Sequence, residues 1–211
     1  MQSNSNYVSV LFVNLLQPIF DLFELLEQSD PKGPNEVQAG MLENGYAVSV
    51  IVLSALVVES ALNRTRYVRN EPKRESAVDT LRRLSAGDLA HEIEEVFVLR
   101  DIIAHNHIWT AAMRWDDSSG MALDSAEKLS AYGDDKFNRV VDSGTRATRR
   151  LHLDAFPTRI HRATATTVLK KTVEALKFLE RLDRRYVYLS QPWHVTRGNK
   201  LVPFYKWVDG L

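Results

Sequence analysis

The chain has 211 residues, with 27 Lys and Arg against 27 Asp and Glu, 45% hydrophobic residues and no cysteine. This length suits a single domain with a sizeable core, and the apolar content excludes a disordered chain. The lack of cysteine excludes a disulfide scaffold and any site built on a thiolate, and a formal net charge of zero argues against a globally basic nucleic-acid-binding protein.

The first third of the chain predicts two helices separated by a break rich in proline. Apolar side chains recur at helical spacing in residues 7–27, and two prolines and a glycine in 29–34 end that helix. Asn35 is a candidate cap for a long helix over 36–69, and Gly45 is a candidate point at which that helix divides.

A short helix is predicted over 72–84, and two further helices are predicted over 89–110 and 157–185. The sequence Ser-Ala-Gly-Asp at 85–88 contains a stop for the first of them and a cap for the second. In the third, valines and leucines return at helical intervals. With the two N-terminal helices, these elements predict a mainly α fold, a bundle of about five helices.

Residues 114–156 predict an insertion before the last long helix. The segment 114–135 is polar and has no clear period, so we expect a loop there. The runs 137–142 and 145–153 are β-branched or alternating and flank a Ser-Gly turn, which indicates a β-hairpin. The final segment, 186–211, is rich in Trp, Tyr and Pro, and we expect it to pack across the bundle as an aromatic tail.

These elements describe one domain over residues 1–211, which we expect to be cytoplasmic and free of membrane contact. The most membrane-like stretch, 46–62, contains three serines and a glutamate and is short for a spanning helix, so we interpret it as a buried bundle helix. The first residues carry no positive charge, and polar residues break the apolar run after them, which argues against a signal peptide.

The zero net charge conceals strong local differences. Residues 61–83 carry seven basic and three acidic side chains, 84–135 carry three basic and eleven acidic ones, and 136–171 carry nine basic and two acidic ones. The two basic segments are interpreted either as solvated faces or as parts of one phosphate-binding surface. Under the second interpretation, the candidate nucleic-acid-binding residues are Arg64, Arg66, Arg69, Arg146, Arg149 and Arg150.

One segment, LRDIIAHNHIW at 99–109, concentrates chemically capable side chains within an apolar helix. Asp101 and His105 are four residues apart and share one helix face, where a carboxylate can orient the imidazole and raise its basicity. Arg100 and His105 are separated by about 140° around the axis, so an undistorted helix does not bring them together. Either the helix frays there or a second helix, such as one from another subunit, closes the site.

Other interpretations of this segment remain. The letters His-Asn-His at 105–107 spell the name of the HNH nucleases, but that family uses well-separated residues on a ββα unit. Asp101 and His105 have the spacing of metal ligands, yet no third ligand is evident, so we expect no metal and no cofactor. If this segment has only a structural role, we expect Arg100 and Asp101 to be surface residues and the two histidines to be half-buried.

The sequence LRDIIAH at 99–105 resembles the signature of the HEPN family: an arginine, a polar residue, a short spacer and a histidine near a helix end. Arg100, Asp101 and His105 match these positions. His107 also satisfies the looser spacing that the family allows. We favour His105, because its spacing is the commoner form in the family and because Asp101 adjoins it.

A second similarity lies in VVESALN at 57–63, which resembles an apolar-Glu-Ser-apolar-Asn stretch on an early helix of many HEPN domains. Glu59 in this apolar helix needs a partner, for which Arg100 is a candidate; a position at the rim of the bundle is the alternative. The predicted helices fit an HEPN bundle, whereas 114–156 is an insertion that the family pattern does not supply.

The resemblance implies a metal-independent ribonuclease, of a kind found in toxin–antitoxin, abortive-infection and other defence systems. HEPN active sites form between two domains, so the implied assembly is a homodimer in which each half supplies an arginine and a histidine. His105 would take the proton of a ribose 2′-OH, and Arg100 would stabilise the transition state. Asp101 or Asn106 would orient the base or the RNA, with Glu59 and His107 as accessory candidates.

The implied partners are an RNA substrate and a cognate antitoxin or inhibitor protein. The alternative hypothesis is a non-catalytic HEPN-like module that binds a partner protein or a nucleotide. Composition does not separate the two hypotheses, because both need the same folded bundle. Cleavage of RNA and toxicity on expression in a host cell separate them.

Overall fold

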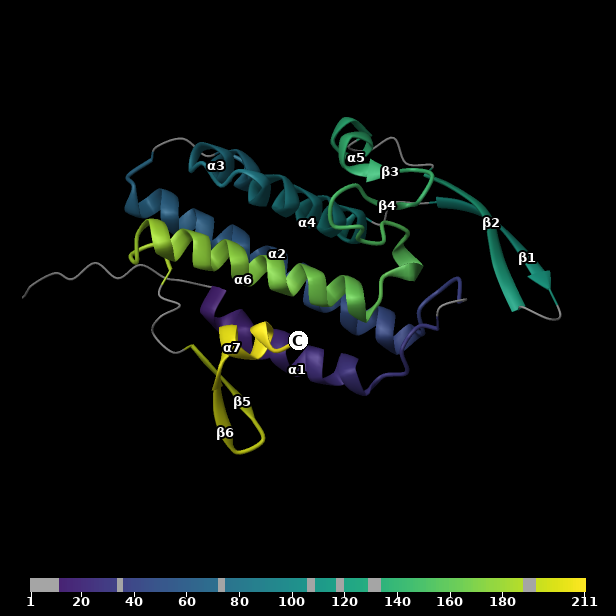
Figure 1. Ribbon diagram of the computed structural model, residues 1–211, viewed down its shortest axis with the longest axis horizontal. Helices are drawn as coiled ribbons and strands as arrows, with labels where there is room; N and C mark the ends of the chain where they lie inside the picture. Colours follow the sequence, from purple (N-terminus) through teal and green to yellow (C-terminus); the bar gives the residue numbers. More distant parts are fainter. Residues whose placement is uncertain are drawn as a thin grey trace, which may run out of the picture.

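The protein is mainly α, as predicted, and its helices pack as a bundle (Figure 1). The computed structural model describes residues 12–33, 36–71, 75–105, 109–116, 120–128, 134–187 and 193–211. These residues contain seven α-helices and three two-stranded antiparallel sheets. The helices are α1 (Leu16–Gln28), α2 (Met41–Val68), α3 (Ala77–Arg83), α4 (Asp88–Ala104), α5 (Asp134–Val140), α6 (Arg162–Leu182) and α7 (Phe204–Asp209), with 3₁₀ turns η1 (Phe12–Leu15) and η2 (Pro157–Arg159).

Helix α2 forms the centre of the bundle and packs against α1, α4 and α6 (Figure 1). Its apolar side chains occupy all sides of the helix rather than one stripe, which is the pattern of a buried helix. It begins at Met41 rather than at Glu36, and Gly45 does not divide it. The candidate cap Asn35 lies outside the described residues. The fully buried apolar residues of α2 are Ala47, Val50, Ile51, Ala55, Val57, Val58, Ala61 and Leu62.

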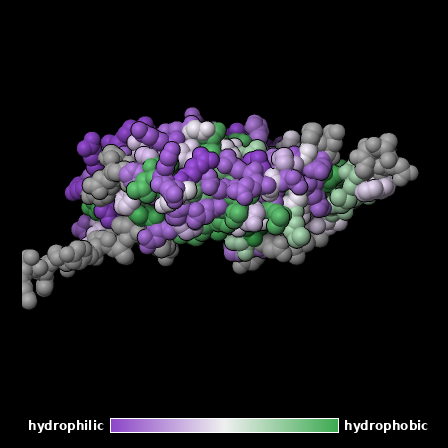
Figure 2. Space-filling model, turned by 90° about the horizontal axis from the view of Figure 1, so that it is seen from below, coloured by the Kyte–Doolittle hydropathy of each residue, from purple (hydrophilic) through white to green (hydrophobic). Residues whose placement is uncertain are grey.

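By length and composition, α2 could also cross a membrane. Half of its most apolar window is buried inside the protein, in agreement with the interpretation of this segment as a bundle helix. The face of the molecule in Figure 2 is largely hydrophilic, and its apolar residues form separate patches rather than a continuous band. The structure is therefore compatible with a soluble protein.

Two charged groups fasten the α1–α2 connection to the start of α6. Glu43 is 1% exposed, and its carboxylate accepts hydrogen bonds from the backbone N–H groups of Lys32 at 2.7 Å and Arg162 at 3.1 Å. The guanidinium of Arg162 donates to the carbonyl oxygens of Leu26 and Ser29, both at 2.8 Å. It therefore binds carbonyl groups that the end of α1 leaves without helical partners.

Helix α4 ends earlier than predicted, at Ala104 instead of at the end of the segment 89–110. His105 follows as its cap, and from Trp109 onward the chain is a strand. The Trp109 ring packs edge-on against Phe137, with 6.0 Å between ring centroids. This tertiary contact is not encoded in the local spacing, and it favours the strand over a continued helix.

The segment 114–135 is mostly a β-hairpin, so the predicted loop is wrong. Strand β1 (Trp109–Asp116) pairs antiparallel with β2 (Gly120–Lys128), and the hairpin projects away from the helices (Figure 1). None of its described side chains is buried, and Trp115 is 73% exposed. Without a buried face, the strands carry no alternation of apolar and polar residues, and periodicity therefore does not reveal them.

The predicted hairpin around the Ser-Gly turn is present only as a pairing of two residues in each strand. These strands are β3 (Val141–Asp142) and β4 (Ala147–Thr148), and most of the residues predicted as the first strand belong to α5 instead. Phe137 and Val140 lie one helical turn apart and pack on α4 in a small second core. This packing selects the helix, although the β-branched composition favours a strand.

The C-terminal segment packs on the bundle as expected and also forms elements that the sequence does not predict. These are a hairpin of β5 (His194–Arg197) with β6 (Lys200–Pro203), followed by α7. Trp207 of α7 is buried and packs edge-on against Phe20 and Phe23 of α1, with ring centroids 4.8 Å and 5.5 Å apart. The aromatic tail thus covers α1.

Candidate functional site

The two segments that carry the HEPN resemblance meet in space, one on α2 and one on α4. Arg100 Nη1 lies 3.6 Å from Glu59 Oε2, so the partner predicted for this glutamate is confirmed; the Glu59 side chain is also 35% exposed, in agreement with the alternative of a position at the rim. Arg100 Nε lies 2.8 Å from Asp101 Oδ1, and the guanidinium carbon is 5.4 Å from the centre of the Phe97 ring. The Arg100 side chain is 25% exposed, so two carboxylates hold it at the edge of the core while it still reaches solvent.

The carboxylate of Asp101 is bound by cations from two different elements. Its Oδ1 contacts Arg100 on the same helix, and its Oδ2 lies 3.2 Å from Nζ of Lys136 on α5. Toward His105, a backbone hydrogen bond of 3.0 Å runs from the His105 N–H to the Asp101 carbonyl oxygen. The Arg100–Asp101 contact is an ion pair without a hydrogen bond from Nε, and the carboxylate–imidazole pair expected from the sequence stays a prediction.

His105 is exposed and immediately follows the last residue of α4. Because α4 is continuous up to Ala104, Arg100 and His105 project in different directions, as the helix geometry predicts. His105 does not line the pocket that contains Arg100. The described part of one chain therefore does not place the two side chains in a common pocket. The other candidates of this segment, Asn106 and His107, lie outside the described residues.

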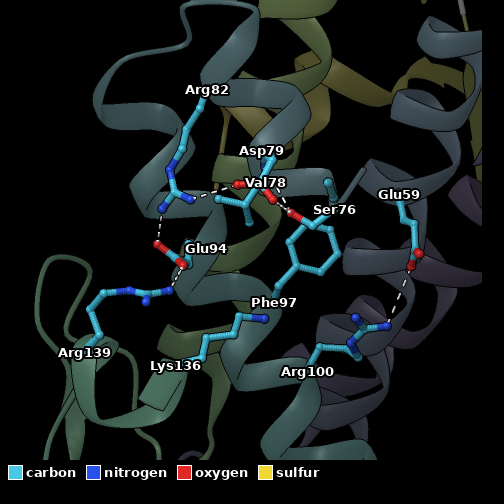
Figure 3. Close-up of a pocket in the computed structure, with 11 residues that line it drawn as sticks. Glu59, Ser76, Val78, Asp79, Arg82, Glu94, Phe97, Arg100, Lys136 and Arg139 are labelled. Atoms are coloured by element: carbon cyan, nitrogen blue, oxygen red, sulfur yellow. Dashed lines mark hydrogen bonds and ion pairs between the residues drawn. The ribbon is translucent and has the colours of Figure 1, made fainter. Parts of the chain in front are cut away.

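A pocket of about 330 Å³ opens beside Arg100, between α2, α3, α4 and α5 (Figure 3). Four cations line it: Arg82, Arg100, Lys136 and Arg139. Arg82 comes from the first basic segment of the sequence, and Lys136 and Arg139 come from the second. Both basic segments thus meet here, through side chains other than the predicted arginines.

Glu94 is the buried anion of this pocket and is not among the residues that the sequence singles out. Its side chain is 7% exposed, and it accepts hydrogen bonds from Arg82 at 2.7 Å and from Arg139 (Figure 3). A buried charge needs such partners, and Glu94 thereby ties α3 and α5 to α4. Glu94 could have been found from the sequence, because it lies seven residues before Asp101 and therefore on the same face of the helix.

The predicted arginines of the first basic segment are engaged within the chain. Arg66 is 8% exposed and donates a 2.7 Å hydrogen bond to Thr80 Oγ1, which joins α2 to α3. Arg69 pairs with Glu71 at 2.5 Å, and Arg64 donates to a backbone carbonyl at 2.9 Å. With its side chain buried among these partners, Arg66 cannot reach a phosphate and instead connects α2 to α3.

The predicted arginines of the second basic segment lie on the loops that follow α5. Arg149 and Arg150 are exposed and pair with Asp142 at 3.6 Å and with Asp88 at 2.9 Å. Arg146 is half-buried and has a positive φ of 59°. None of the three lines the pocket beside Arg100.

A second charged pair, which the sequence does not single out, lies at the start of α6. His161 Nδ1 is 3.2 Å from Asp154 Oδ2 and 3.0 Å from the Arg159 carbonyl oxygen. The hydrogen bond to Asp154 raises the pKa of His161, while burial and the positive charge of Lys32 oppose the rise. The pair connects the end of the insertion to α6.

We expect the free energy of unfolding to fall as the pH rises through the raised pKa of His161. Asp154 stabilises the protonated imidazole only in the folded state, so this stabilisation is complete below the ordinary value of 6.5 and is lost above the folded value. His161→Asn should remove this dependence, which urea unfolding over a pH series measures. The same dependence in wild type and variant would contradict the assignment.

No family model, curated protein or solved structure matches the chain. The HEPN resemblance therefore rests on the sequence, above all on the two short segments 57–63 and 99–105, which the Arg100–Glu59 ion pair brings together in space. Within the described ranges of the chain, no group of three or more His, Cys, Asp or Glu residues is placed to hold a metal ion.

Proposed function

We propose that the protein is a metal-independent RNA endonuclease of the HEPN type that acts in the cytoplasm as a homodimer. The observation that supports this most is the ion pair between Arg100 and Glu59, because it joins the two segments that resemble the family. The pair holds a partly exposed arginine near the C-terminal end of α4, five residues before the exposed His105. A mainly α bundle is also the fold class that the resemblance implies.

In the proposed reaction, His105 takes the proton from a ribose 2′-OH, and the 2′-oxygen attacks the adjacent phosphorus. The P–O5′ bond breaks, which leaves a 2′,3′-cyclic phosphate, and the 5′-oxygen receives a proton from His105 of the second protomer. Arg100 donates to the phosphate oxygens and stabilises the additional negative charge of the transition state. Glu59 and Asp101 are positioning residues, because they act by holding Arg100 in place.

The proposed active site lies between two protomers, since one α4 directs Arg100 and His105 to different sides. Each protomer supplies one arginine and one histidine to the shared site. From the same resemblance, we propose that the protein is a toxin or phage-defence effector and that a cognate antitoxin or inhibitor protein inhibits it.

The test is RNA cleavage by the purified protein in the presence of a metal chelator. We expect wild type to produce 2′,3′-cyclic phosphate ends and Arg100→Ala to be slower by roughly 10²–10³-fold, the usual cost of removing a donor that binds the transition state. Arg197→Ala is a matched control, because it removes another ion-paired arginine, 2.9 Å from Glu24. Wild-type rates in a folded Arg100→Ala variant would overturn the proposal.

The second candidate function is a non-catalytic module that binds a partner protein or a nucleotide. The observation that favours it is that every cation lining the pocket has a carboxylate partner, so the charges are balanced without a ligand. It predicts that wild type cleaves no RNA and that Arg100→Ala binds the partner normally. Toxicity on expression in a host cell, relieved by Arg100→Ala, would favour the nuclease instead.

A further inference from the structure

The insertion contributes α5 to the wall of the pocket beside Arg100. Phe137 and Val140 anchor α5 on α4, and they are only 4% and 5% exposed. Lys136 and Arg139 lie three residues apart on α5, and both side chains line the pocket (Figure 3). The family resemblance supplies no counterpart of this insertion, so these two cations are an addition of this chain.

Lys136 and Arg139 keep hydrogen-bond donors available in the described structure. Lys136 Nζ contacts one oxygen of Asp101 at 3.2 Å, whereas an ammonium group has three donors. Arg139 binds Glu94 through Nη2, whereas a guanidinium has five donors, and its side chain is 59% exposed. The carboxylates therefore hold both cations in place without occupying all of their donors.

We propose that Lys136 and Arg139 bind a phosphate group of the RNA strand next to the phosphate held by Arg100. A volume of about 330 Å³ lies at the small end of ligand pockets and suits a single nucleotide. The lining of the pocket also includes two apolar side chains, Val78 and Phe97, which are 5% and 3% exposed. The identity of the ligand as RNA rests on the proposed function, whereas the binding itself can be measured without cleavage.

The experiment measures RNA binding in a His105→Ala background, in which the proposed reaction is blocked. A labelled single-stranded RNA oligonucleotide is titrated by fluorescence anisotropy at several salt concentrations. Adding Lys136→Ala and Arg139→Ala together should weaken binding about tenfold or more. The slope of log K against log salt should become shallower by about 0.7, because the two cations hold one phosphate and each lost phosphate contact contributes about 0.7 for a single strand.

The matched control is the double variant Arg181→Ala, Lys206→Ala, which removes two exposed cations outside the pocket and should leave affinity and slope unchanged. If the pocket double variant fails to fold, Lys136→Ala alone should weaken binding relative to the control and change the slope by less than the double variant is expected to. Equal binding by pocket and control variants, or no RNA binding at all, would overturn the phosphate site. Selective loss of binding together with no cleavage by wild type would support the phosphate site and overturn the nuclease.

Discussion

Replacement of His105 by alanine is expected to slow RNA cleavage by roughly 10²–10⁴-fold, the usual contribution of a general acid or base. In the proposed reaction, both proton transfers pass through the His105 side chains of the dimer. RNA affinity should change little, because Arg100 and the cations of α5 are retained. Single-turnover cleavage at saturating RNA measures the rate, and anisotropy on an RNA with a 2′-deoxy substitution at the cleaved position measures the affinity.

His91→Ala is the matched control for this prediction, because His91 is an exposed histidine on the same helix α4. It should cleave RNA at the wild-type rate. A folded His105→Ala variant that also cleaves at the wild-type rate would reject His105 as the catalytic histidine. His107→Ala would then be expected to show the loss, since His107 is the alternative that the family spacing allows.

Mixing the two inactive variants separates a shared site from a site within one chain. A mixed dimer of Arg100→Ala and His105→Ala protomers retains one arginine and one histidine at the proposed interface. Recovery of cleavage to a rate above either variant but below wild type is therefore expected after subunit exchange, because one of the two proton transfers still has its histidine. Mixed dimers that form but stay as inactive as either variant would contradict the shared site.

Replacement of Glu43 by alanine is expected to lower the free energy of unfolding by about 3 kcal/mol, since hydrogen bonds to a charged group contribute about 1.5–3 kcal/mol each. The Glu43 carboxylate is 1% exposed and accepts the backbone N–H groups of Lys32 and Arg162. Its loss leaves both donors without an acceptor and an empty volume between α2 and α6. Urea unfolding followed by circular dichroism measures the change.

Two further variants show whether the buried carboxylate causes this effect. Glu43→Gln keeps the shape but only one acceptor oxygen, so about half of the loss is expected. Glu27→Ala removes an exposed carboxylate at the end of α1 and should change stability by less than about 0.5 kcal/mol. Equal stability of Glu43→Ala and Glu27→Ala would show that the Glu43 hydrogen bonds contribute nothing.

The helices that form the bundle could be predicted because the spacing of apolar residues within each segment indicates a helix with a buried face. The stretch 46–62 is apolar on all sides, and the structure places it in α2 at the centre of the protein. Glu59 is a charged residue in this apolar stretch and therefore suggests a charged partner; in the structure its side chain is 35% exposed and pairs with Arg100. For the same reason, its pairing with Arg100 could be anticipated from two separate segments of the chain.

The insertion could not be predicted, because its structure depends on contacts with other elements. Apart from its base, where Trp109 packs on Phe137, the described part of the β1–β2 hairpin has no buried face, so its strands have no alternating pattern. Phe137 and Val140 favour α5 only through their packing on α4, against the local preference for a strand. The same packing places Lys136 and Arg139 in the wall of the pocket. It also brings Lys136 to Asp101 and Arg139 to Glu94.

The zero net charge of the chain conceals a pocket in which cations from both basic segments of the sequence meet. The amino-acid sequence by itself determined a cysteine-free, mainly α bundle with Arg100, Asp101 and His105 near one helix end, because helical periodicity and i,i+4 spacing are local properties. Only the tertiary structure decided which charges meet. It buries Arg66 within the bundle and brings Lys136 beside Arg100, because ion pairing and burial depend on residues that are distant in the chain.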